Sequence, residues 1–190
     1  MQMLPIKTAR FYYEHLLDSE INLKLIQNFC IDKESGKGLE LYLKTSSVNE
    51  EKENSSRTYL IKDNDTKELA GYFSLRNGLF TISIDEDDFY SVPAIELSNF
   101  AVNSEYRKNH PESKLLGKKI FNDFVKPLVY YLMDFTGIQA LYIYALPEDE
   151  LIEHYETFGF SRLDSEVEKF VHKHVKPSYD EGCIFMYQIL

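Results

Sequence analysis

The sequence predicts a mixed α/β domain, and three observations indicate this class. Residues 95–160 follow the pattern strand, loop, helix, strand and helix, the order of a strand–helix–strand crossover. Residues 58–61 and 69–75 flank the turn-rich segment 63–67, which is typical of two antiparallel strands. The chain has 190 residues, of which 44% are hydrophobic and 27% are charged, so we expect one ordinary core rather than disorder.

The N-terminal 57 residues are expected to be mostly helical. A first helix is predicted from the i, i+4 spacing of Phe11 and His15. Either Asp18 or Ser19 would cap a second helix, because short polar side chains bind the free N–H groups at a helix start. The expected ranges are helices over 9–17, 20–31 and 38–48, then a polar loop at 49–57.

The central segment supplies the buried strands. An apolar run at 94–102 predicts a central strand, although it carries Glu96. A long helix is expected over 114–134, with a kink or break near Pro127, because proline has no backbone donor. A second buried strand at 141–145 would lie parallel to the first if this helix crosses between them.

The C-terminal segment continues this alternation. Pro147 and Glu148 are expected to open a helix, where proline is tolerated, and Gly159 is expected to end it. Further strands are predicted over 79–84, 160–163 and 182–190, and a further helix over 165–175.

Charge and cysteine content limit the partners and the compartment. The formal net charge is −10, which disfavours nonspecific binding to nucleic acid or to an anionic membrane. The sequence contains neither an apolar run long enough to cross a bilayer nor a signal-peptide pattern. Cys30 and Cys183 lie far apart and lack metal-ligand spacing, and the acidic run 85–88 lacks a calcium-loop pattern. We therefore expect a cytoplasmic protein that does not cross a membrane and contains no metal.

Two stretches form a recognisable pair of motifs. Tyr155-Glu-Thr-Phe-Gly-Phe160 places a tyrosine before Gly-Phe at a helix end, and 96–102 runs into Glu105-Tyr-Arg107. Together they resemble the GNAT superfamily of N-acetyltransferases, which use acetyl-coenzyme A, and the first stretch is the better match. The resemblance covers the C-terminal half well and the first half only by the order of its elements. It implies an α/β (α+β) fold with a mostly antiparallel sheet of about six or seven strands, a central splayed parallel pair and flanking helices.

The resemblance also implies a single domain, 1–190, in which three segments have different roles. Residues 1–57 would lie on the substrate side, 58–163 would form the core that binds acetyl-CoA, and 164–190 would add a C-terminal helix and strand. The implied reaction is transfer of acetyl from acetyl-CoA to a primary amine in a direct ternary complex.

Two side chains are the catalytic candidates. Glu96 would act as general base, directly or through a water molecule, and Tyr155 would donate a hydrogen bond to the departing sulfur. Each has a simpler structural interpretation. Glu96 could be an acid paired with a cross-strand Lys, Arg or Tyr, and Tyr155 could be a core residue packed on Phe158 and Phe160.

The cofactor-binding candidates fall on the central strand and on the start of the following helix. A backbone N–H near Phe100 would face the acetyl carbonyl, and the strand around Ala101 and Val102 would pair with the pantetheine chain. In the phosphate loop Arg107 takes the place of the family's arginine and Leu115 that of its first glycine, but the loop is about five residues too long. An alternative register puts Lys114 in the arginine place. The further candidates are Leu116, Gly117 and Lys118 in this loop, and Glu148 near the place of a family asparagine.

Two other functions remain open from the sequence. The stretched phosphate loop is also compatible with a catalytically silent binding or regulatory module on the same fold. A toxin that acetylates aminoacyl-tRNA is a third candidate, against which the acidic charge argues. The expected partners are a small-molecule or peptide amine, with nucleic acid unfavoured and a homodimer allowed.

Overall fold

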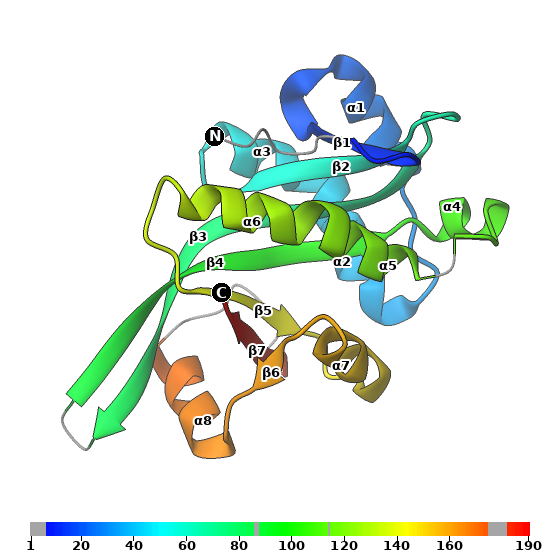
Figure 1. The fold of residues 1–190 in the computed structure, drawn as a ribbon. Coiled ribbons are helices and arrows are strands. Elements are labelled where there is room, and N and C mark those ends of the chain that lie inside the picture. Colours follow the sequence, from blue (N-terminus) through cyan, green and yellow to red (C-terminus); the bar gives the residue numbers. More distant parts are fainter. Residues whose placement is uncertain (1–6, 86–87, 114, 175–181) are drawn as a thin grey trace. The chain divides into compact units, whose positions relative to one another are not determined.

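A computed structural model describes residues 7–85, 88–113, 115–174 and 182–190, and Figure 1 shows its strands and helices. Within these residues the strands form one sheet of seven, in the order β1-β2-β3-β4-β5-β7-β6. The strands are β1 Phe11–His15, β2 Arg57–Asp63, β3 Leu69–Asp85, β4 Asp88–Val102, β5 Ala140–Ala145, β6 Ser161–Arg162 and β7 Ile184–Ile189.

One pair of neighbouring strands runs parallel. β4 and β5 are in parallel register at Ala94↔Ala140, Ile95↔Leu141 and Glu96↔Tyr142, whereas β1/β2, β2/β3, β5/β7 and β6/β7 pair antiparallel. The parallel register ends at Glu96 and Tyr142, although both strands continue beyond these residues. The predicted fold class, a mostly antiparallel mixed sheet with one parallel pair and flanking helices, is confirmed.

The helices are short, and several are joined end to end. Their bounds are α1 Glu20–Leu25, α2 Lys37–Thr45, α3 Ser47–Lys52, α4 Ser104–Asn109, α5 Leu116–Ile120, α6 Lys126–Met133, α7 Asp149–Glu156 and α8 Ser165–His174. Short 3-10 turns lie at η1 Leu16–Asp18, η2 Ile26–Asn28 and η3 Glu34–Gly36, and a π turn, η4, lies at Phe121–Val125.

The chain divides into two compact units. Unit 1 comprises the chain up to Arg76 together with Ser98–Leu128, and unit 2 comprises Asn77–Leu97 together with Val129–Leu190. The long strands β3 and β4 therefore contribute residues to both units.

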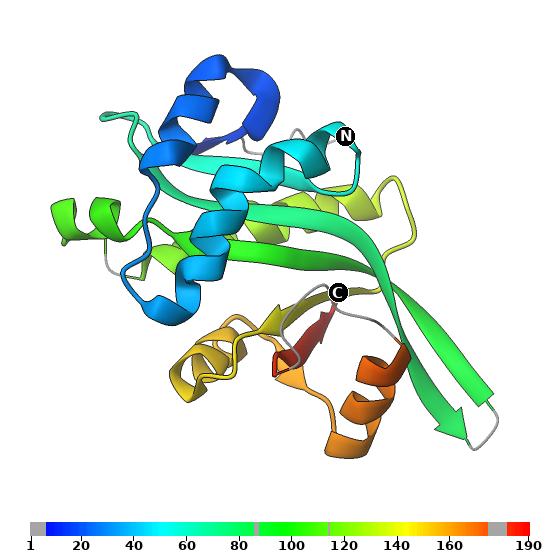
Figure 2. The ribbon, with the colours of Figure 1, turned by 180° about the vertical axis from the view of Figure 1, so that it is seen from behind.

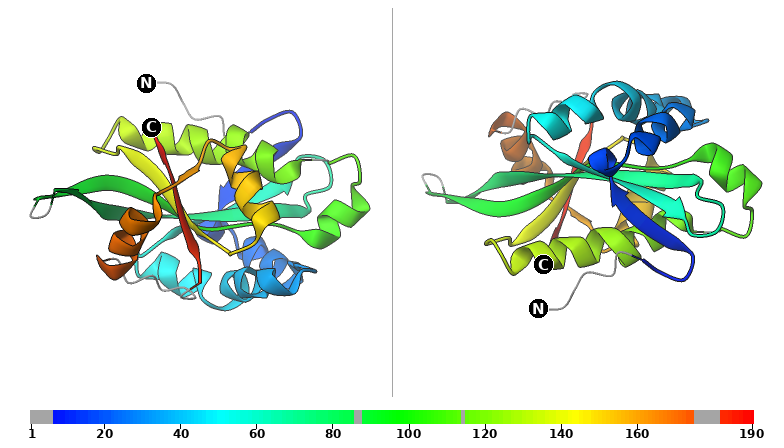
Figure 3. Two further views of the ribbon diagram at one scale, coloured as in Figure 1. Left: turned by 90° about the horizontal axis from the view of Figure 1, so that it is seen from below. Right: turned by 90° about the horizontal axis from the view of Figure 1, so that it is seen from above.

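Unit 1 packs helices on both faces of its strands. α2 and α3 lie along one face of β2 and β3 (Figure 2), and the helical segment that α5 begins lies on the opposite face (Figure 3). Gly71 permits close packing in β3, because a Cβ there would lie 2.8 Å from the Ala101 carbonyl oxygen and 2.9 Å from the Ile120 Cδ1. The core cluster on the α1–α2 side contains Leu16, Ile26, Phe29, Leu43, Leu60, Leu69, Tyr72 and Ala101.

Unit 2 has an aromatic core. The rings of Phe80 and Phe185 lie 5.1 Å apart, and that of Tyr142 lies 5.8 and 5.5 Å from them. The buried members of the cluster are Phe80, Val92, Ala94, Ala140, Tyr142, Val171 and Phe185. Many of the chain's tyrosines and phenylalanines therefore serve packing, each adding a large apolar area to the core.

The helix expected over 9–17 is wrong, because this segment contains the strand β1. β1 pairs with β2 from Phe11↔Asp63 to His15↔Tyr59, and the Tyr13 and Tyr59 rings pack edge to face at 5.4 Å. A window of nine residues is compatible with both helical and alternating spacing, and cross-strand aromatic packing favours the strand here.

Other boundaries also differ from the expectation. The strands expected over 69–75 and 79–84 are one strand, β3, and the helix expected over 38–48 is divided into α2 and α3. The helix expected over 20–31 keeps its Ser19 cap, whose hydroxyl accepts the Ile21 N–H, but α1 ends at Leu25.

The expected disturbance near Pro127 is confirmed and takes the form of a π turn. Pro127 cannot donate to the carbonyl four residues earlier, and its ring would collide with that carbonyl in a regular helix. In η4 the Lys126 N–H reaches the Phe121 carbonyl five residues back, which widens the helix just before the proline. The helix therefore continues into α6 instead of breaking.

Candidate functional site

The pairing of β4 with β5 places Glu96 beside Tyr142 in unit 2. Residues in register on parallel strands point to the same face of the sheet. The Tyr142 hydroxyl donates a hydrogen bond to Glu96 Oε2 at 3.1 Å, and the two residues are only 3% and 6% exposed. A buried carboxylate requires such a partner, so the cross-strand tyrosine considered from the sequence is present.

The charge of Glu96 also reaches a second tyrosine of unit 2. Burial raises the pKa of the Tyr144 hydroxyl, and the negative charge of Glu96 raises it further. Tyr144 therefore stays protonated near neutral pH. Glu96 lies among phenols that can donate hydrogen bonds to it but cannot supply a negative charge.

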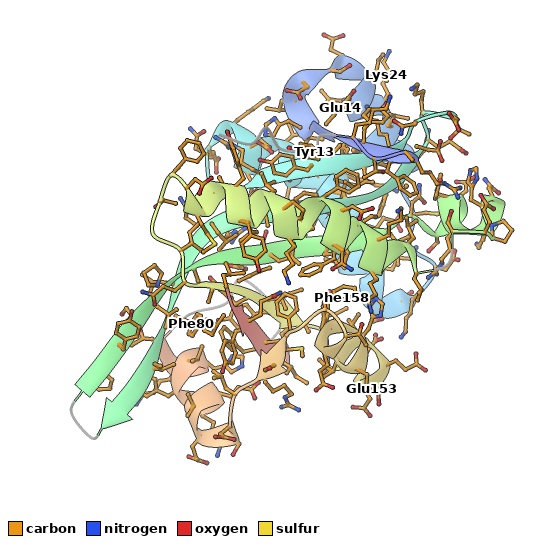
Figure 4. All side chains as sticks on the ribbon, in the orientation of Figure 1. Tyr13, Glu14, Lys24, Phe80, Glu153 and Phe158 are labelled. Atoms are coloured by element: carbon orange, nitrogen blue, oxygen red, sulfur yellow. The ribbon has the colours of Figure 1, made fainter. Side chains whose placement is uncertain are left out.

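Tyr155 lies on α7, also in unit 2, and its ring is held by the helix end. Gly159 has φ +96°, which lets the chain reverse so that the N–H groups of Phe158 and Phe160 both donate to the Tyr155 carbonyl. The Tyr155 ring packs edge to face on Phe158 and Phe160, each at 5.8 Å, and Phe158 is labelled in Figure 4.

The Tyr155 hydroxyl makes no hydrogen bond within the described residues, and burial raises the pKa of this phenol above its ordinary value of 10.0. Tyr155 thus combines the core packing of the structural interpretation with a hydroxyl able to serve a ligand.

Unit 1 contains the cofactor candidates at the end of β4. Phe100 and Ala101 are buried, and Val102 is partly exposed. Asn103 then fixes the strand end: its side chain donates to the Leu69 carbonyl and accepts the Glu105 N–H, and its backbone N–H donates to the Ala70 carbonyl. The Asn103 cap begins α4 at Ser104, so the extended loop expected at Arg107 is wrong. Arg107 is an exposed residue on this helix.

The residue before α5 has an unusual backbone conformation. Leu115 has φ 58° and ψ 30°, the left-handed conformation that glycine adopts most readily, and α5 begins at the next residue. Leu115 is the residue that we expected from the sequence in the place of the first glycine of the phosphate loop. Leu116 is buried, while Gly117 and Lys118 are partly exposed. Lys114 lies outside the described residues.

Glu148 occupies the N-cap position of α7. Its backbone carbonyl accepts the Leu151 and Ile152 N–H groups, and its side chain does not cap the helix. The helix therefore begins at Asp149, two residues after Pro147. This places Glu148 at the junction between the end of β5 and α7, where the sequence comparison had put it.

A buried polar network in unit 1 was missed from the sequence. Tyr106 is 1% exposed, and its hydroxyl donates to Asp63 Oδ2 at 2.6 Å. Arg10 donates to the Tyr106 hydroxyl at 3.2 Å and to Glu112 at 2.5 Å. The network ties α4 to the end of β2, and the only sequence signal was the pairing of a turn aspartate with a tyrosine inside the second GNAT-like stretch.

Across the residues that the structure describes, no three His, Cys, Asp or Glu side chains gather as ligands for a metal ion. None of the helices described is both long enough and apolar enough to cross a bilayer.

Several solved structures of the toxins AtaT and KacT are similar to this chain. A tyrosine-to-phenylalanine mutant of the toxin AtaT, bound to the C-terminus of the antitoxin AtaR and to acetyl-CoA, has a TM-score of 0.62 at 18% identity, covering 94% of this chain and 92% of that one. A tyrosine-to-phenylalanine mutant of KacT has a TM-score of 0.64 at 15% identity, covering 95% of each chain. AtaT with acetyl-methionyl-tRNAfMet has a TM-score of 0.57 at 18% identity, covering 92% of this chain and 93% of that one.

These likenesses establish the fold of the chain over nearly its whole length. No protein-family model matches the sequence, and no curated protein matches it either. The recognition of a GNAT-type fold from the two sequence stretches is therefore confirmed by structure.

The partners expected from the sequence are overturned by the same comparisons. The similar structures hold an antitoxin, DNA in the KacTA complex, and a charged tRNA, whereas we had expected a small-molecule or peptide amine with nucleic acid unfavoured. The expectation rested on a net charge of −10, and a sum over all side chains does not describe the local charge where a ligand binds.

Proposed function

Because the chain has the fold of the GNAT acetyltransferases, we propose that it transfers acetyl from acetyl-CoA to the primary amine of an aminoacyl-tRNA. The observation that carries this proposal is the likeness to AtaT, solved with acetyl-CoA and with acetyl-methionyl-tRNAfMet, over more than nine tenths of both chains. The proposed site of action is the cytoplasm, where charged tRNA is used.

The residues of this chain fit acetyl-CoA as a co-substrate. The left-handed Leu115 and the start of α5 offer backbone N–H groups that a helix leaves without internal partners, which suits a pyrophosphate. The end of β4, from Phe100 to Val102, would hold the pantetheine chain through its backbone. Glu148 at the start of α7, Arg107 and the lysines of the α5 loop are the further candidates. Acetyl-CoA supplies an activated acetyl group as a thioester.

The proposed chemistry assigns a role to each of two buried side chains: Glu96 is the proton acceptor and Tyr155 is a hydrogen-bond donor. Glu96 accepts a proton from the attacking amine, directly or through a water molecule, as the new carbon–nitrogen bond forms. A backbone N–H near Phe100 stabilises the negative charge that develops on the carbonyl oxygen. The carbon–sulfur bond then breaks, and the Tyr155 hydroxyl donates a hydrogen bond to the departing sulfur.

Tyr155 is better suited to donate a hydrogen bond than to give up its proton. An ordinary thiol has a pKa of about 8.5 and a phenol one of about 10, so full proton transfer costs roughly 2 kcal/mol before burial is considered. Burial raises the pKa of Tyr155 further, so the cost grows. Water then completes the proton balance by protonating the thiolate.

The direct test follows labelled acetyl from acetyl-CoA into charged tRNA. The wild-type protein is expected to acetylate a mixture of aminoacyl-tRNAs, and to leave deacylated tRNA unlabelled because the acceptor amine is then missing. Acetyl-CoA, but not ADP at equal concentration, is expected to raise the melting temperature strongly, because it binds only the folded protein. Tight binding of acetyl-CoA without labelled tRNA would instead favour a binding module.

A single substitution tests the role of Tyr155. Tyr155→Phe is expected to lower kcat roughly 100-fold, the order of magnitude for removing one hydrogen-bond donor to a charge that develops in the transition state. The same change should alter the free energy of unfolding by less than about 1 kcal/mol, because the hydroxyl makes no hydrogen bond within the described residues and the ring packing on Phe158 and Phe160 is kept. An unchanged kcat at saturating substrates would exclude Tyr155 from the reaction.

A further inference from the structure

We propose that Tyr142 is a positioning residue for the acetyl transfer, and that its hydroxyl holds the Glu96 carboxylate in the orientation in which it accepts the amine proton. This inference rests on the proposed function. The sequence comparison did not single out Tyr142, because its relation to Glu96 depends on the register between two strands 46 residues apart.

The first support is the position of the pair in the sheet. Glu96↔Tyr142 is the last of the three pairs in the parallel register. Backbone pairing fixes the strand position of Glu96 but does not fix the rotamer of its side chain. A cross-strand hydrogen bond from the neighbouring side chain supplies the missing constraint on the Glu96 rotamer.

The second support is the rigidity of the Tyr142 ring. A Cβ on Gly78 would lie 2.2 Å from the Tyr142 hydroxyl and 2.9 Å from its Cε1 and Cζ, so the phenol rests directly on the backbone of β3. Phe185 stacks on the ring at 5.5 Å, and Phe80 packs against its edge at 5.8 Å (Phe80 is labelled in Figure 4). The phenol therefore cannot swing away from Glu96 without disturbing β3 and β7.

The third support is what Gly78 does for this contact. β-strands disfavour glycine, and a glycine inside one often marks a close approach of other groups. At Gly78 the approaching group is the hydroxyl that binds Glu96. β3 thus has a glycine, which is unfavourable in a strand, at a position where any side chain would push the Tyr142 hydroxyl away from the Glu96 carboxylate.

The test combines Tyr142→Phe with Glu96→Gln. Tyr142→Phe alone is expected to lower kcat for acetylation of aminoacyl-tRNA roughly 10-fold, because the base loses its fixed orientation, with the KM for acetyl-CoA changed less than about 2-fold. In the Glu96→Gln background the same substitution should cause no further loss, because the residue it positions can no longer accept the proton.

A matched control separates positioning from packing. Tyr187 is the register partner of Tyr142 on β7 and lies in the same aromatic cluster. Tyr187→Phe removes a hydroxyl from this cluster without touching the bond to Glu96, and it should keep the wild-type kcat. Gly78→Ala should lower kcat as Tyr142→Phe does, and should lower it less when Tyr142→Phe is already present, because the closest clash is then removed.

Each outcome decides the proposal. Full kcat in Tyr142→Phe, or an equal further loss in the Glu96→Gln background, overturns the positioning role while the proposed function stands. Full kcat in Glu96→Gln also overturns it, since no base would then be positioned. Absence of acetyl transfer by the wild-type protein overturns the proposed function and this inference together. Circular dichroism and melting temperature confirm that each variant is folded.

Discussion

Leu115, in the proposed phosphate loop, has a left-handed backbone conformation. A leucine with φ 58° is rare, because its Cβ approaches the following carbonyl oxygen, at a cost of roughly 1–2 kcal/mol. Its side chain is 70% exposed, so the conformation is not retained for the sake of core packing. The backbone conformation of Leu115, and not its side chain, is therefore the feature of this position that could matter to a bound phosphate.

Leu115→Gly is expected to tighten the binding of acetyl-CoA. Glycine lets the backbone come closer to a pyrophosphate, and about 1 kcal/mol of additional binding free energy corresponds to roughly a 5-fold lower Kd. Glycine also adopts φ > 0 without strain, a relief that is the same with and without the ligand. The free energy of unfolding should change little, because the relief is offset by the greater freedom of glycine in the unfolded chain.

Isothermal titration of the two proteins with acetyl-CoA measures this change. Leu115→Ala serves as the control, because alanine keeps the strain and removes only the exposed side chain. Equal affinity in all three proteins would mean that this backbone does not contact the co-substrate.

At the residue scale, the sequence predicted the kind of side chain that pairs with Glu96 but not which residue it is. The structural interpretation of Glu96 named a cross-strand Lys, Arg or Tyr as its partner, and a tyrosine is there. Tyr142 itself could not be chosen, because a one-residue change of register would have placed another side chain beside Glu96. The lack of a hydrogen bond to the Tyr155 hydroxyl, too, depends on packing that no sequence spacing encodes.

At the level of elements, α4 explains how the chain accommodates its lengthened loop. Asn103 caps a helix directly after β4, so part of the extra length forms α4 instead of an open loop. The capping asparagine followed by Ser-Glu was visible in the sequence. It was missed because the resemblance favoured a loop at this place, and the tertiary bonds of Asn103 to Leu69 and Ala70 could not be foreseen.

The contact between Tyr106 and Asp63 should make the stability of unit 1 depend on acid. Burial alone would raise the pKa of Asp63, but hydrogen bonds from the Tyr106 hydroxyl and the Asp65 and Thr66 N–H groups, with the charge of Arg10, lower it to about 2. A carboxyl with a depressed pKa stabilises the fold above its ordinary pKa of 3.8 and loses this contribution as the pH falls through 2.

Asp63→Asn is therefore expected to lower the free energy of unfolding at pH 7 by about 2 kcal/mol, and the difference from wild type should shrink between pH 4 and pH 2. Urea titrations at pH 7, 4 and 2.5 measure it. Asp65→Asn, at an exposed position in the same turn, is the matched control and should follow the wild type. A difference that stays constant with pH would show that the Asp63 charge does not stabilise the fold.

On the scale of the whole molecule, fold class was predictable because it depends on the order of elements. The crossover between two buried strands, the helix ended by Gly159 and the terminal strand were each visible as patterns, and together they admit few sheet topologies. The partner class was not predictable, because it depends on where charges lie and not on their sum. A net charge of −10 is compatible with a local surface that accepts phosphates.

The proposed acceptor makes the salt dependence of the reaction a test of the whole molecule. A protein that contacts about three phosphates of a single-stranded nucleic acid should lose roughly 20-fold in affinity between 50 and 200 mM salt, because bound counterions are released on binding. The KM for aminoacyl-tRNA is therefore expected to rise by this factor, whereas kcat at saturating substrate should not change. The KM for acetyl-CoA, which carries few charges, should rise much less and serves as the internal control. Steady-state kinetics over this salt range measures all three quantities. A KM for aminoacyl-tRNA that does not respond to salt would mean that the chain recognises the amino acid without binding the polyanion that carries it.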